Sequence, residues 1–182
     1  MKIMNRDVQS ILFAEDEIKQ RVAQMGEQIS RDYQGKELVL LGILRGCVVF
    51  LSDLMRHITV PCEIDFMSVS SYGFGAQTTG AVTIRHDMTM DPKGKNLLIV
   101  EDILDTGVTL SHVKPALEQR GAASVKIASL LDKPSRRKVD IQLDYYGFST
   151  PNQFLVGYGL DYAEKYRNLP YIGVLKPEIY QK

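Results

Sequence analysis

The sequence is poor in the residues that build disulfide frameworks and zinc sites. Its 182 residues include two cysteines, three histidines and no tryptophan. Cys47 and Cys62 form no CxxC pair and the histidines are scattered, so no zinc-ligand spacing is present. Both thiols are therefore expected to be reduced and structural. Any metal ion that the protein needs must be a hard cation held by oxygen ligands.

The sequence also lacks an excess of charge and any long apolar run. Its 22 basic and 22 acidic residues give a formal net charge of zero, whereas a general binder of nucleic acid or membrane surfaces needs a basic excess. No stretch approaches the roughly 18 apolar residues of a membrane span, and the N-terminal MKIMNRDVQS has no apolar signal-peptide core. We therefore expect a cytoplasmic protein whose partners include no nucleic acid and no membrane.

Hydrophobic residues make up 45% of the chain, which suits one domain over residues 1–182 with a substantial core. The spacing of apolar residues predicts helices over 15–33, 47–58 and 110–117. Short apolar runs predict strands at 37–44, 62–72, 81–86, 96–100, 124–132, 139–148, 153–160 and 171–175. The alternation of helices and strands predicts an α/β fold with a mainly parallel central sheet.

A glycine-rich segment, YGFGAQTTG at residues 72–80, separates two of the predicted strands. It offers few apolar side chains that could anchor it, which favours a mobile loop or hairpin. We expect a flexible two-stranded loop over about 71–85 that closes over the site. The alternative is a fixed surface hairpin with no part in catalysis.

The segment LLIVEDILDTGVTL, residues 97–110, places acids and small residues where an apolar strand gives way to a helix. Glu101 and Asp102 come at the carboxyl end of the strand, where open α/β sheets bind their ligands. The turn DTGVT, residues 105–109, offers backbone amides and two hydroxyls to a phosphate. Acids for vicinal hydroxyls or Mg²⁺, beside amides for a phosphate, fit a ribose 5-phosphate.

A plainer interpretation is that Glu101 and Asp102 only cap a strand and that Thr106 and Gly107 form a tight turn. Strand-terminal acids are common, so the acidic pair alone would favour that interpretation. Acids, hydroxyls and a glycine together at one strand-to-helix junction favour phosphate binding instead. The segment is neither a Walker loop nor a GxGxxG loop.

The stretch VEDILDTGVTL resembles the phosphoribosyl pyrophosphate-binding signature of type I phosphoribosyltransferases. That signature alone would also admit enzymes acting on adenine, orotate or uracil. Four further stretches resemble the hypoxanthine-guanine phosphoribosyltransferases, in the order and spacing of the bacterial members: GILRGCVVF (42–50), SSYG (70–73), LLDKPSRR (130–137) and FLVGYGLDYAEKYRNLPYIGVL (154–175). The resemblance covers nearly the whole chain, and its lysine stretch and C-terminal run are specific to 6-oxopurines.

The resemblance implies an enzyme of purine salvage that uses Mg²⁺. Such an enzyme transfers the 5-phosphoribosyl group of phosphoribosyl pyrophosphate to N9 of hypoxanthine or guanine, giving IMP or GMP and pyrophosphate. The implied fold is the type I phosphoribosyltransferase fold, a sheet flanked by helices with a small hood from about 1–14 and 150–182. The resemblance also implies a homodimer or homotetramer and a cis peptide bond between Leu44 and Arg45.

The resemblance further assigns residues to the phosphoribosyl half of the site. Glu101 and Asp102 would hold the ribose hydroxyls and help to place Mg²⁺, and Asp105 matches the proposed general base near purine N7. The 5′-phosphate is expected on the backbone of Asp105, Thr106, Gly107, Val108 and Thr109.

The remaining assignments concern pyrophosphate and the purine. The residues expected at pyrophosphate are Leu44, Arg45, Gly46, Ser71, Tyr72 and Arg167. The residues expected at the purine are Lys133 as donor to O6, Phe154 stacked on the ring, Leu155 through its backbone, and Asp161, which would bind a second Mg²⁺.

The chemistry of the reaction agrees with this set of residues. Loss of pyrophosphate leaves an oxocarbenium-like carbon, as in glycoside cleavage, and pyrophosphate leaves well only if its charge is neutralised. The incoming purine must lose a proton, so a carboxylate near the ring is useful. A lysine facing O6 favours 6-oxo bases, because the 6-amino group of adenine is a donor that would leave the ammonium unpaired.

Several of these residues have ordinary interpretations when they are taken singly. Lys133 lies in the basic cluster KPSRRK, which could be solvated surface, and Phe154 could be core. Asp161 and Arg167 could be an ordinary surface acid and base, and Arg45 beside a glycine could be a plain turn. Their joint agreement with one substrate geometry favours the functional interpretation.

Three alternative functions stand beside the salvage enzyme. A regulatory RNA-binding protein can retain this fold, although zero net charge and the intact purine-side stretch argue against it. A phosphoribosyltransferase for xanthine or adenine would share the phosphate turn, and a non-catalytic α/β signalling module would not need it. Preference among hypoxanthine, guanine and xanthine stays open, because backbone carbonyls sense the C2 substituent.

Overall fold

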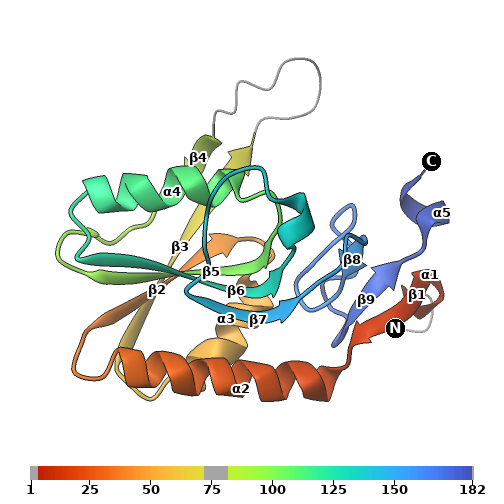
Figure 1. The fold of residues 1–182 in the computed structure, drawn as a ribbon, viewed down its shortest axis with the longest axis horizontal. Helices are drawn as coiled ribbons and strands as arrows, with labels where there is room; N and C mark the ends of the chain where they lie inside the picture. The colour runs from red at the N-terminus through yellow and green to blue at the C-terminus, as the bar shows by residue number, and fades with distance from the viewer. Residues whose placement is uncertain (1–3, 72–81, 182) are drawn as a thin grey trace.

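The computed structural model describes residues 4–71 and 82–181, which form a six-stranded sheet between helices and a smaller three-stranded sheet beside it (Figure 1). The elements are α1 (Met4–Asp7), β1 (Val8–Phe13), α2 (Glu15–Asp32), β2 (Leu38–Leu44), α3 (Val48–Met55), β3 (Cys62–Ser71), β4 (Val82–His86), β5 (Asn96–Leu104), α4 (Val108–Gln119), β6 (Ser124–Asp132), the 3₁₀ helix η1 (Pro134–Arg136), β7 (Tyr145–Ser149), β8 (Leu155–Val156), β9 (Ile172–Leu175) and α5 (Pro177–Tyr180).

The large sheet is mainly parallel, as the alternation of helices and strands predicted. Its strand order is β4-β3-β2-β5-β6-β7. Each pairing from β3 through β7 is parallel, and only the edge strand β4 runs antiparallel to its neighbour β3. The parallel strands therefore bring their carboxyl ends to one edge of the sheet, where ligands bind in folds of this kind.

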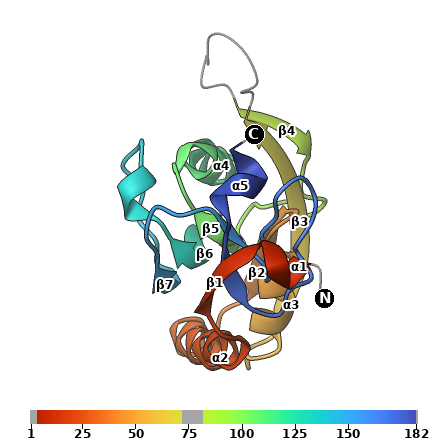
Figure 2. The ribbon, with the colours of Figure 1, turned by 90° about the vertical axis from the view of Figure 1, so that its right-hand side faces the viewer.

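Alternating side chains of the central strands pack into two separate cores, one on each face of the sheet. On β2, Leu38 and Leu40 pack with α2 and α3, whereas Val39 and Leu41 pack with α4. This alternation follows from the two-residue period of a strand. Figure 2 shows α2 and α4 on opposite faces of the sheet. The continuous apolar run of the sequence is thus explained, because both faces of the strand are buried.

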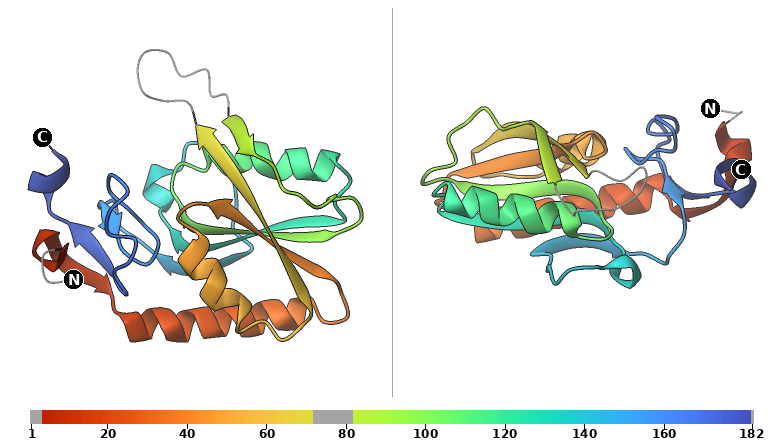
Figure 3. Two further views of the ribbon diagram at one scale, coloured as in Figure 1. Left: turned by 180° about the vertical axis from the view of Figure 1, so that it is seen from behind. Right: turned by 90° about the horizontal axis from the view of Figure 1, so that it is seen from above.

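The small sheet forms the hood that the resemblance implied. It has the order β1-β9-β8 with antiparallel pairings, so the N-terminal strand lies against the C-terminal part of the chain. Figure 3 shows it at one end of the large sheet. Strand β1 was not predicted from the sequence, since its partner β9 lies near the other end of the chain, and a local pattern does not reveal such a pairing.

Three predicted strands were wrong in extent. The run 96–100 continues through the two acids to Leu104 as β5. The run 139–148 is irregular up to Asp144, where the Asp144 carboxylate accepts a hydrogen bond from the backbone N–H of Ile127 at 2.9 Å, and β7 begins only at Tyr145. The run 153–160 contributes only β8, because Gly157 and Gly159 have φ values of +98° and +100° and turn the chain. Before β7, the alternating Ile141 and Leu143 pack against the core without a strand partner.

Other expectations concern the backbone and the flexible loop. The Leu44–Arg45 bond is cis, which confirms the expectation. Strands β3 and β4 pair antiparallel as predicted, but the predicted loop between them, with Tyr72 and the side chain of Ser71, lies outside the described residues. Among the described helices, none is long and apolar enough to cross a membrane.

Candidate active site

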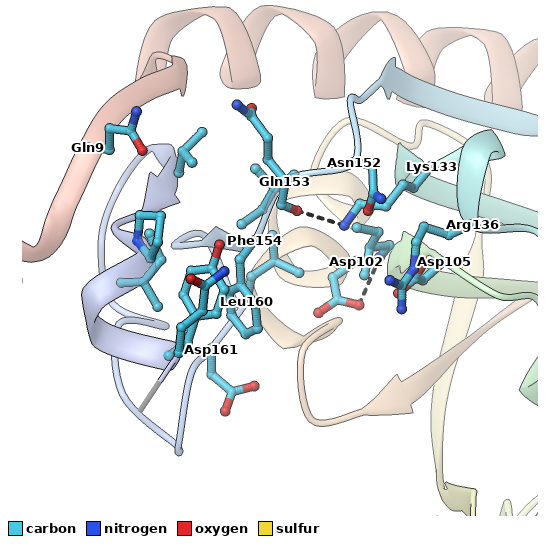
Figure 4. A pocket seen from close by; sticks show the side chains of 17 residues that line it. Gln9, Asp102, Asp105, Lys133, Arg136, Asn152, Gln153, Phe154, Leu160 and Asp161 are labelled. Carbon is cyan, nitrogen blue, oxygen red and sulfur yellow. Dashed lines mark hydrogen bonds and ion pairs between the residues drawn. The ribbon is translucent and has the colours of Figure 1, made fainter.

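A cavity of about 740 Å³ opens between the carboxyl edge of the large sheet and the hood. Figure 4 shows Asp102, Asp105 and Lys133 reaching it from the sheet side, opposite Phe154 and Asp161 from the hood side. Six of the predicted site residues line this cavity: Asp102, Asp105, Lys133, Phe154, Leu155 and Asp161. Residues from four predicted groups, the phosphoribosyl, metal, catalytic and purine sets, therefore meet at one place.

The turn of residues 105–109, predicted to bind a phosphate and called the phosphate turn below, lies at the junction of β5 and α4. Gly107 is the N-cap of α4 with φ +80°, a left-handed conformation that favours glycine. A Cβ on Gly107 would lie 2.6 Å from Ile141 and 3.0 Å from Val139, so the irregular segment after η1 covers the turn closely. The first backbone amides of α4 have no intrahelical acceptor, which makes this helix start suited to an anion.

Glu101 and Asp102 are crowded carboxylates of β5 that come directly after the last residue pairing with β2. Both keep some contact with solvent. Burial raises the pKa of Asp102 to about 6, and the pKa of Glu101 lies well above its usual value because of burial and the neighbouring Asp102. The loop after β2 closes on this pair, since a Cβ on Gly46 would collide with Oδ2 of Asp102. Only glycine fits there.

Asp105 projects into the cavity just beyond the end of β5. Its carboxylate forms an ion pair with Arg136, with Nε 3.3 Å from Oδ1, and both side chains keep solvent contact. The Arg136 partner was not predicted, although it lies in the LLDKPSRR stretch. A partly exposed carboxylate with a weakly held partner can accept a proton from a ligand in the cavity.

Lys133 is the buried cation of the site. It is 7% exposed and its ammonium donates to the carbonyl of Gln153 at 2.8 Å. Burial lowers the pKa of Lys133, against the opposing effect of the nearby Asp105 carboxylate. The interpretation of KPSRRK as a wholly solvated cluster is therefore wrong at Lys133.

The two cations predicted for pyrophosphate share one acidic partner that the sequence did not reveal. Arg45 and Arg167 lie 3.0 and 3.1 Å from Oε2 of Glu164, and Arg167 also pairs with Asp161 at 2.9 Å. These two arginines lower the pKa of Glu164. The loop after β2 and the segment after β8 are thereby brought together, which no local pattern could show.

Phe154 lies within an aromatic group on the hood. Its ring stacks on Tyr180 of α5 with centroids 4.8 Å apart, and Tyr162 meets it edge-on at 5.5 Å. Leu155 is 6% exposed and pairs with Val174 in the small sheet. Tyr180 lines the cavity but was not predicted, because the resemblance ends before it.

The carboxylates that line the cavity offer oxygen ligands to a metal ion. Among the described residues, no three His, Cys, Asp or Glu side chains converge as a complete metal cage. Mg²⁺ usually keeps several waters and binds through one or two carboxylates together with substrate phosphates. The pair Glu101 and Asp102 beside a phosphate-binding turn fits that requirement.

The comparisons with known proteins agree with this geometry. The chain matches the family model described as a phosphoribosyl transferase domain over residues 8–163. Parallel sheet, phosphate turn and hood together define a type I phosphoribosyltransferase, so the predicted fold is confirmed.

Individual relatives show which phosphoribosyltransferases the chain is similar to. The chain is 51% identical to the hypoxanthine-guanine phosphoribosyltransferase of Lactococcus lactis over 181 residues, 100% of this chain and 98% of the relative. It is 50% identical to that of Streptococcus pneumoniae over 178 residues, 98% and 99% of the two chains. A crystal structure of a hypoxanthine phosphoribosyltransferase from Staphylococcus aureus superimposes with a TM-score of 0.95 at 48% identity, covering 99% and 98%. The chain belongs to the hypoxanthine-guanine phosphoribosyltransferase family.

Proposed function

We propose that the enzyme serves purine salvage by transferring the 5-phosphoribosyl group of phosphoribosyl pyrophosphate to N9 of hypoxanthine or guanine. The products are IMP or GMP and pyrophosphate. One observation carries the assignment: a buried ammonium, Lys133, and an open carboxylate, Asp105, line one cavity beside the phosphate turn. The family membership of the whole chain supports it.

The phosphoribosyl group binds over the junction of β5 and α4. The amides of the turn 105–109 and the helix start bind the 5′-phosphate, because unpaired N–H groups and the helix dipole both favour an anion. Glu101 and Asp102 accept hydrogen bonds from the ribose hydroxyls and would hold Mg²⁺, which would supply positive charge beside the leaving pyrophosphate group.

The purine binds between the sheet edge and the hood. Lys133 turns its ammonium from the carbonyl of Gln153 towards O6, or donates to both, since an ammonium has three donors. Phe154 packs on the ring, held by Tyr180 and Tyr162. The backbone around Leu155 contacts the Watson–Crick edge, and Asp161 lies at the same wall of the cavity, where it would hold a second Mg²⁺.

Pyrophosphate binds where the loop after β2 meets the hood. Arg45 and Arg167 supply positive charge, and the backbone of Leu44 and Gly46 supplies hydrogen-bonding groups. Glu164 pairs with both arginines and so holds the two guanidinium groups close together. Ser71 and Tyr72 complete this set in the proposal.

The reaction then follows from where charge develops. Positive charge grows on C1 as the bond to pyrophosphate lengthens, and the carboxylates near the ribose face that charge. Asp105 accepts the purine proton at N7 as N9 attacks C1, while Lys133 stabilises the electron density that moves to O6. The same ammonium disfavours adenine, which presents a donor at that position.

Steady-state kinetics on a panel of bases tests the proposed function. With phosphoribosyl pyrophosphate and Mg²⁺, we expect turnover of hypoxanthine and guanine and little turnover of adenine. The values of kcat/KM for hypoxanthine, guanine and xanthine rank the 6-oxopurines. A preference for adenine, or retention of RNA on a filter at physiological salt without base turnover, would contradict the proposal.

We also propose a cytoplasmic homodimer or homotetramer, which the family resemblance supports. Sedimentation velocity of the purified chain distinguishes these states from a monomer.

A further inference from the structure

One arginine joins the carboxyl ends of two strands whose next residues, Asp105 and Lys133, line the cavity. Nη1 of Arg137 donates to the carbonyls of Leu104 at 2.9 Å and Asp105 at 2.6 Å, and Nη2 forms an ion pair with the Asp132 carboxylate. Leu104 and Asp105 end β5 and follow it, and Asp132 ends β6. Arg137 is therefore bonded to both strands at their carboxyl ends.

The Arg137 contact lies where the hydrogen-bonded ladder between β5 and β6 ends. The ladder between β5 and β6 ends at the pair Leu104 and Asp132. Asp105 and Lys133 are the next residues on the two strands, so no ladder hydrogen bond fixes one relative to the other. The links there include the backbone N–H of Lys133, which donates to the Leu104 carbonyl at 3.1 Å, the exposed ion pair of Arg136 with the Asp105 carboxylate, and the half-buried guanidinium of Arg137, which bonds the backbone of both residues at the end of β5.

The proposed substrate requires a fixed spacing between Asp105 and Lys133. N7 and O6 of a 6-oxopurine lie on the same edge of the base, so the group that meets N7 and the group that meets O6 must be held in register. We infer that Arg137 is a positioning residue that sets the spacing between Asp105 and Lys133, an inference that rests on the proposed function. Arg137 itself does not line the cavity.

An arginine suits this task better than a neutral donor. Its planar fork carries five N–H groups, so it bonds two carbonyls and a carboxylate at once without freedom to swing. The Arg137 and Asp132 side chains are only 18% and 22% exposed, so water competes little for these bonds. The side chain also packs on the phosphate turn, since Cδ lies 3.2 Å from the place that a Cβ on Gly107 would occupy.

The chain contains a matched control. Arg21 of α2 also donates to two backbone carbonyls, Gly147 at 2.9 Å and Tyr146 at 2.7 Å, and does not line the cavity. Arg21→Gln therefore removes the same number of carbonyl bonds. We expect it to lower the thermal midpoint while leaving kcat/KM for hypoxanthine within about twofold of wild type, as for a site remote from the chemistry.

A double-mutant cycle on the full-length enzyme tests the inference. Arg137→Gln should lower kcat/KM for hypoxanthine about 10²-fold, the scale of a misplaced reacting group. In an Asp105→Asn background the same change should cost less than about tenfold, because the carboxylate it positions is already absent. Arg137→Lys, which keeps one charged contact, should fall between wild type and Arg137→Gln and replaces Arg137→Gln if that variant does not fold.

The outcomes separate the inference from the proposed function. A loss of the same size in both backgrounds, or a folded Arg137 variant within about twofold of wild type, would overturn the positioning role. An inactive wild-type enzyme on every 6-oxopurine would overturn the proposed function and the inference with it. An active wild type with strong coupling between Arg137 and Asp105 supports both.

Discussion

The two charged side chains proposed to meet the purine differ in their surroundings. Lys133 is 7% exposed, whereas the Asp105 side chain is 38% exposed. The ammonium has already lost most of its water before a base binds, so a base carbonyl replaces little solvation there. The open carboxylate keeps water until the base arrives. The site thus fixes its hydrogen-bond donor firmly and leaves its proton acceptor accessible.

Substitution of Asp105 tests the proton acceptor. Asp105→Asn keeps the shape of the side chain but removes its basicity, so kcat should fall by roughly 10²-fold or more while the KM for phosphoribosyl pyrophosphate changes little. Steady-state kinetics with each substrate varied in turn provides the measurement. Asp16→Asn, which alters a side chain 99% exposed on α2, serves as the control. Near-normal turnover by Asp105→Asn would remove the general base from this mechanism.

Substitution of Lys133 tests base choice and pH dependence. Lys133→Met should cost about 2–4 kcal/mol of transition-state binding for hypoxanthine, the range for losing a charged hydrogen bond to substrate. Activity needs the protonated amine, and burial lowers its pKa. The wild-type kcat/KM should therefore fall with rising pH at a lower pH than an ordinary lysine would give.

The ratio of wild-type to Lys133→Met activity is the informative quantity, because titration of the base itself cancels in it. That ratio should decline towards alkaline pH. Lys93→Met, a change at an exposed turn, should follow the wild-type profile. A ratio independent of pH would show that the Lys133 charge does not act on the base.

At the scale of elements, the phosphate turn depends on the start of α4 and on the segment that covers it. Gly107 combines a left-handed φ with close contacts to Val139 and Ile141. Lys138 adds a backbone hydrogen bond to the Thr106 carbonyl at 3.0 Å. A turn enclosed on one side by packed side chains presents its amides on the other side only.

Two glycine substitutions separate backbone strain from loss of this enclosure. Gly94 has φ +73°, and a Cβ at that position would meet no atom within 4 Å, so Gly94→Ala carries only the left-handed strain of about 1–2 kcal/mol. Gly107→Ala adds overpacking against Ile141, about 1–3 kcal/mol more. Chemical denaturation measures both, and only Gly107→Ala should raise the KM for phosphoribosyl pyrophosphate. Equal KM values for the two variants would show that the turn tolerates displacement.

The sequence predicted those elements whose pattern is local. Residues 97–110 show a buried strand, two acids, a glycine turn and a helix in one run, and the structure has β5, the turn and α4 there. The amphipathic α2 was likewise predicted within a residue or two of its bounds. Each of these signals comes from neighbouring residues, so no knowledge of the tertiary fold was needed.

The sequence could not predict features whose partners are distant along the chain. Arg137 bonds carbonyls more than 30 residues away, and Glu164 joins Arg45 to Arg167 across more than 100 residues. Val139 and Ile141 alternate as in a strand, but they cover Gly107 instead. Periodicity reports that a side chain is buried and not what buries it.

At the scale of the whole molecule, the wall proposed to bind the base and the edge proposed to bind the phosphoribosyl group belong to different sheets. The hood therefore needs a fixed position on the large sheet. The loop 157–160 helps to fix the hood through two contacts. A Cβ on Gly159 would collide with the Gly46 carbonyl, and the Tyr158 hydroxyl donates to Asp53 of α3 at 2.5 Å. We expect contact between these parts to set the width of the cavity.

Three tyrosine–aspartate hydrogen bonds allow this contact to be tested against matched controls. Tyr158 joins the hood to α3, Tyr145 of β7 donates to the exposed Asp32 at the end of α2 at 2.7 Å, and Tyr166 donates to Asp7 beside the small sheet at 2.8 Å. Each Tyr→Phe change removes one hydrogen bond to a carboxylate. Each should therefore lower the free energy of unfolding by a similar amount, about 1.5–3 kcal/mol.

Only the Tyr158→Phe change should also affect catalysis, because only that bond holds the hood against the large sheet. We expect its KM for hypoxanthine to rise about threefold to tenfold, as for a small misplacement of a binding wall, while the Tyr145→Phe and Tyr166→Phe variants keep wild-type KM values. Denaturant unfolding and steady-state kinetics on the three variants give both quantities. Hydrogen exchange over residues 157–160 should increase more in Tyr158→Phe than in the other two variants. If all three variants lose stability but share one KM, then the width of the cavity does not depend on this bond, and the close contact of Gly159 with Gly46 holds the hood in place.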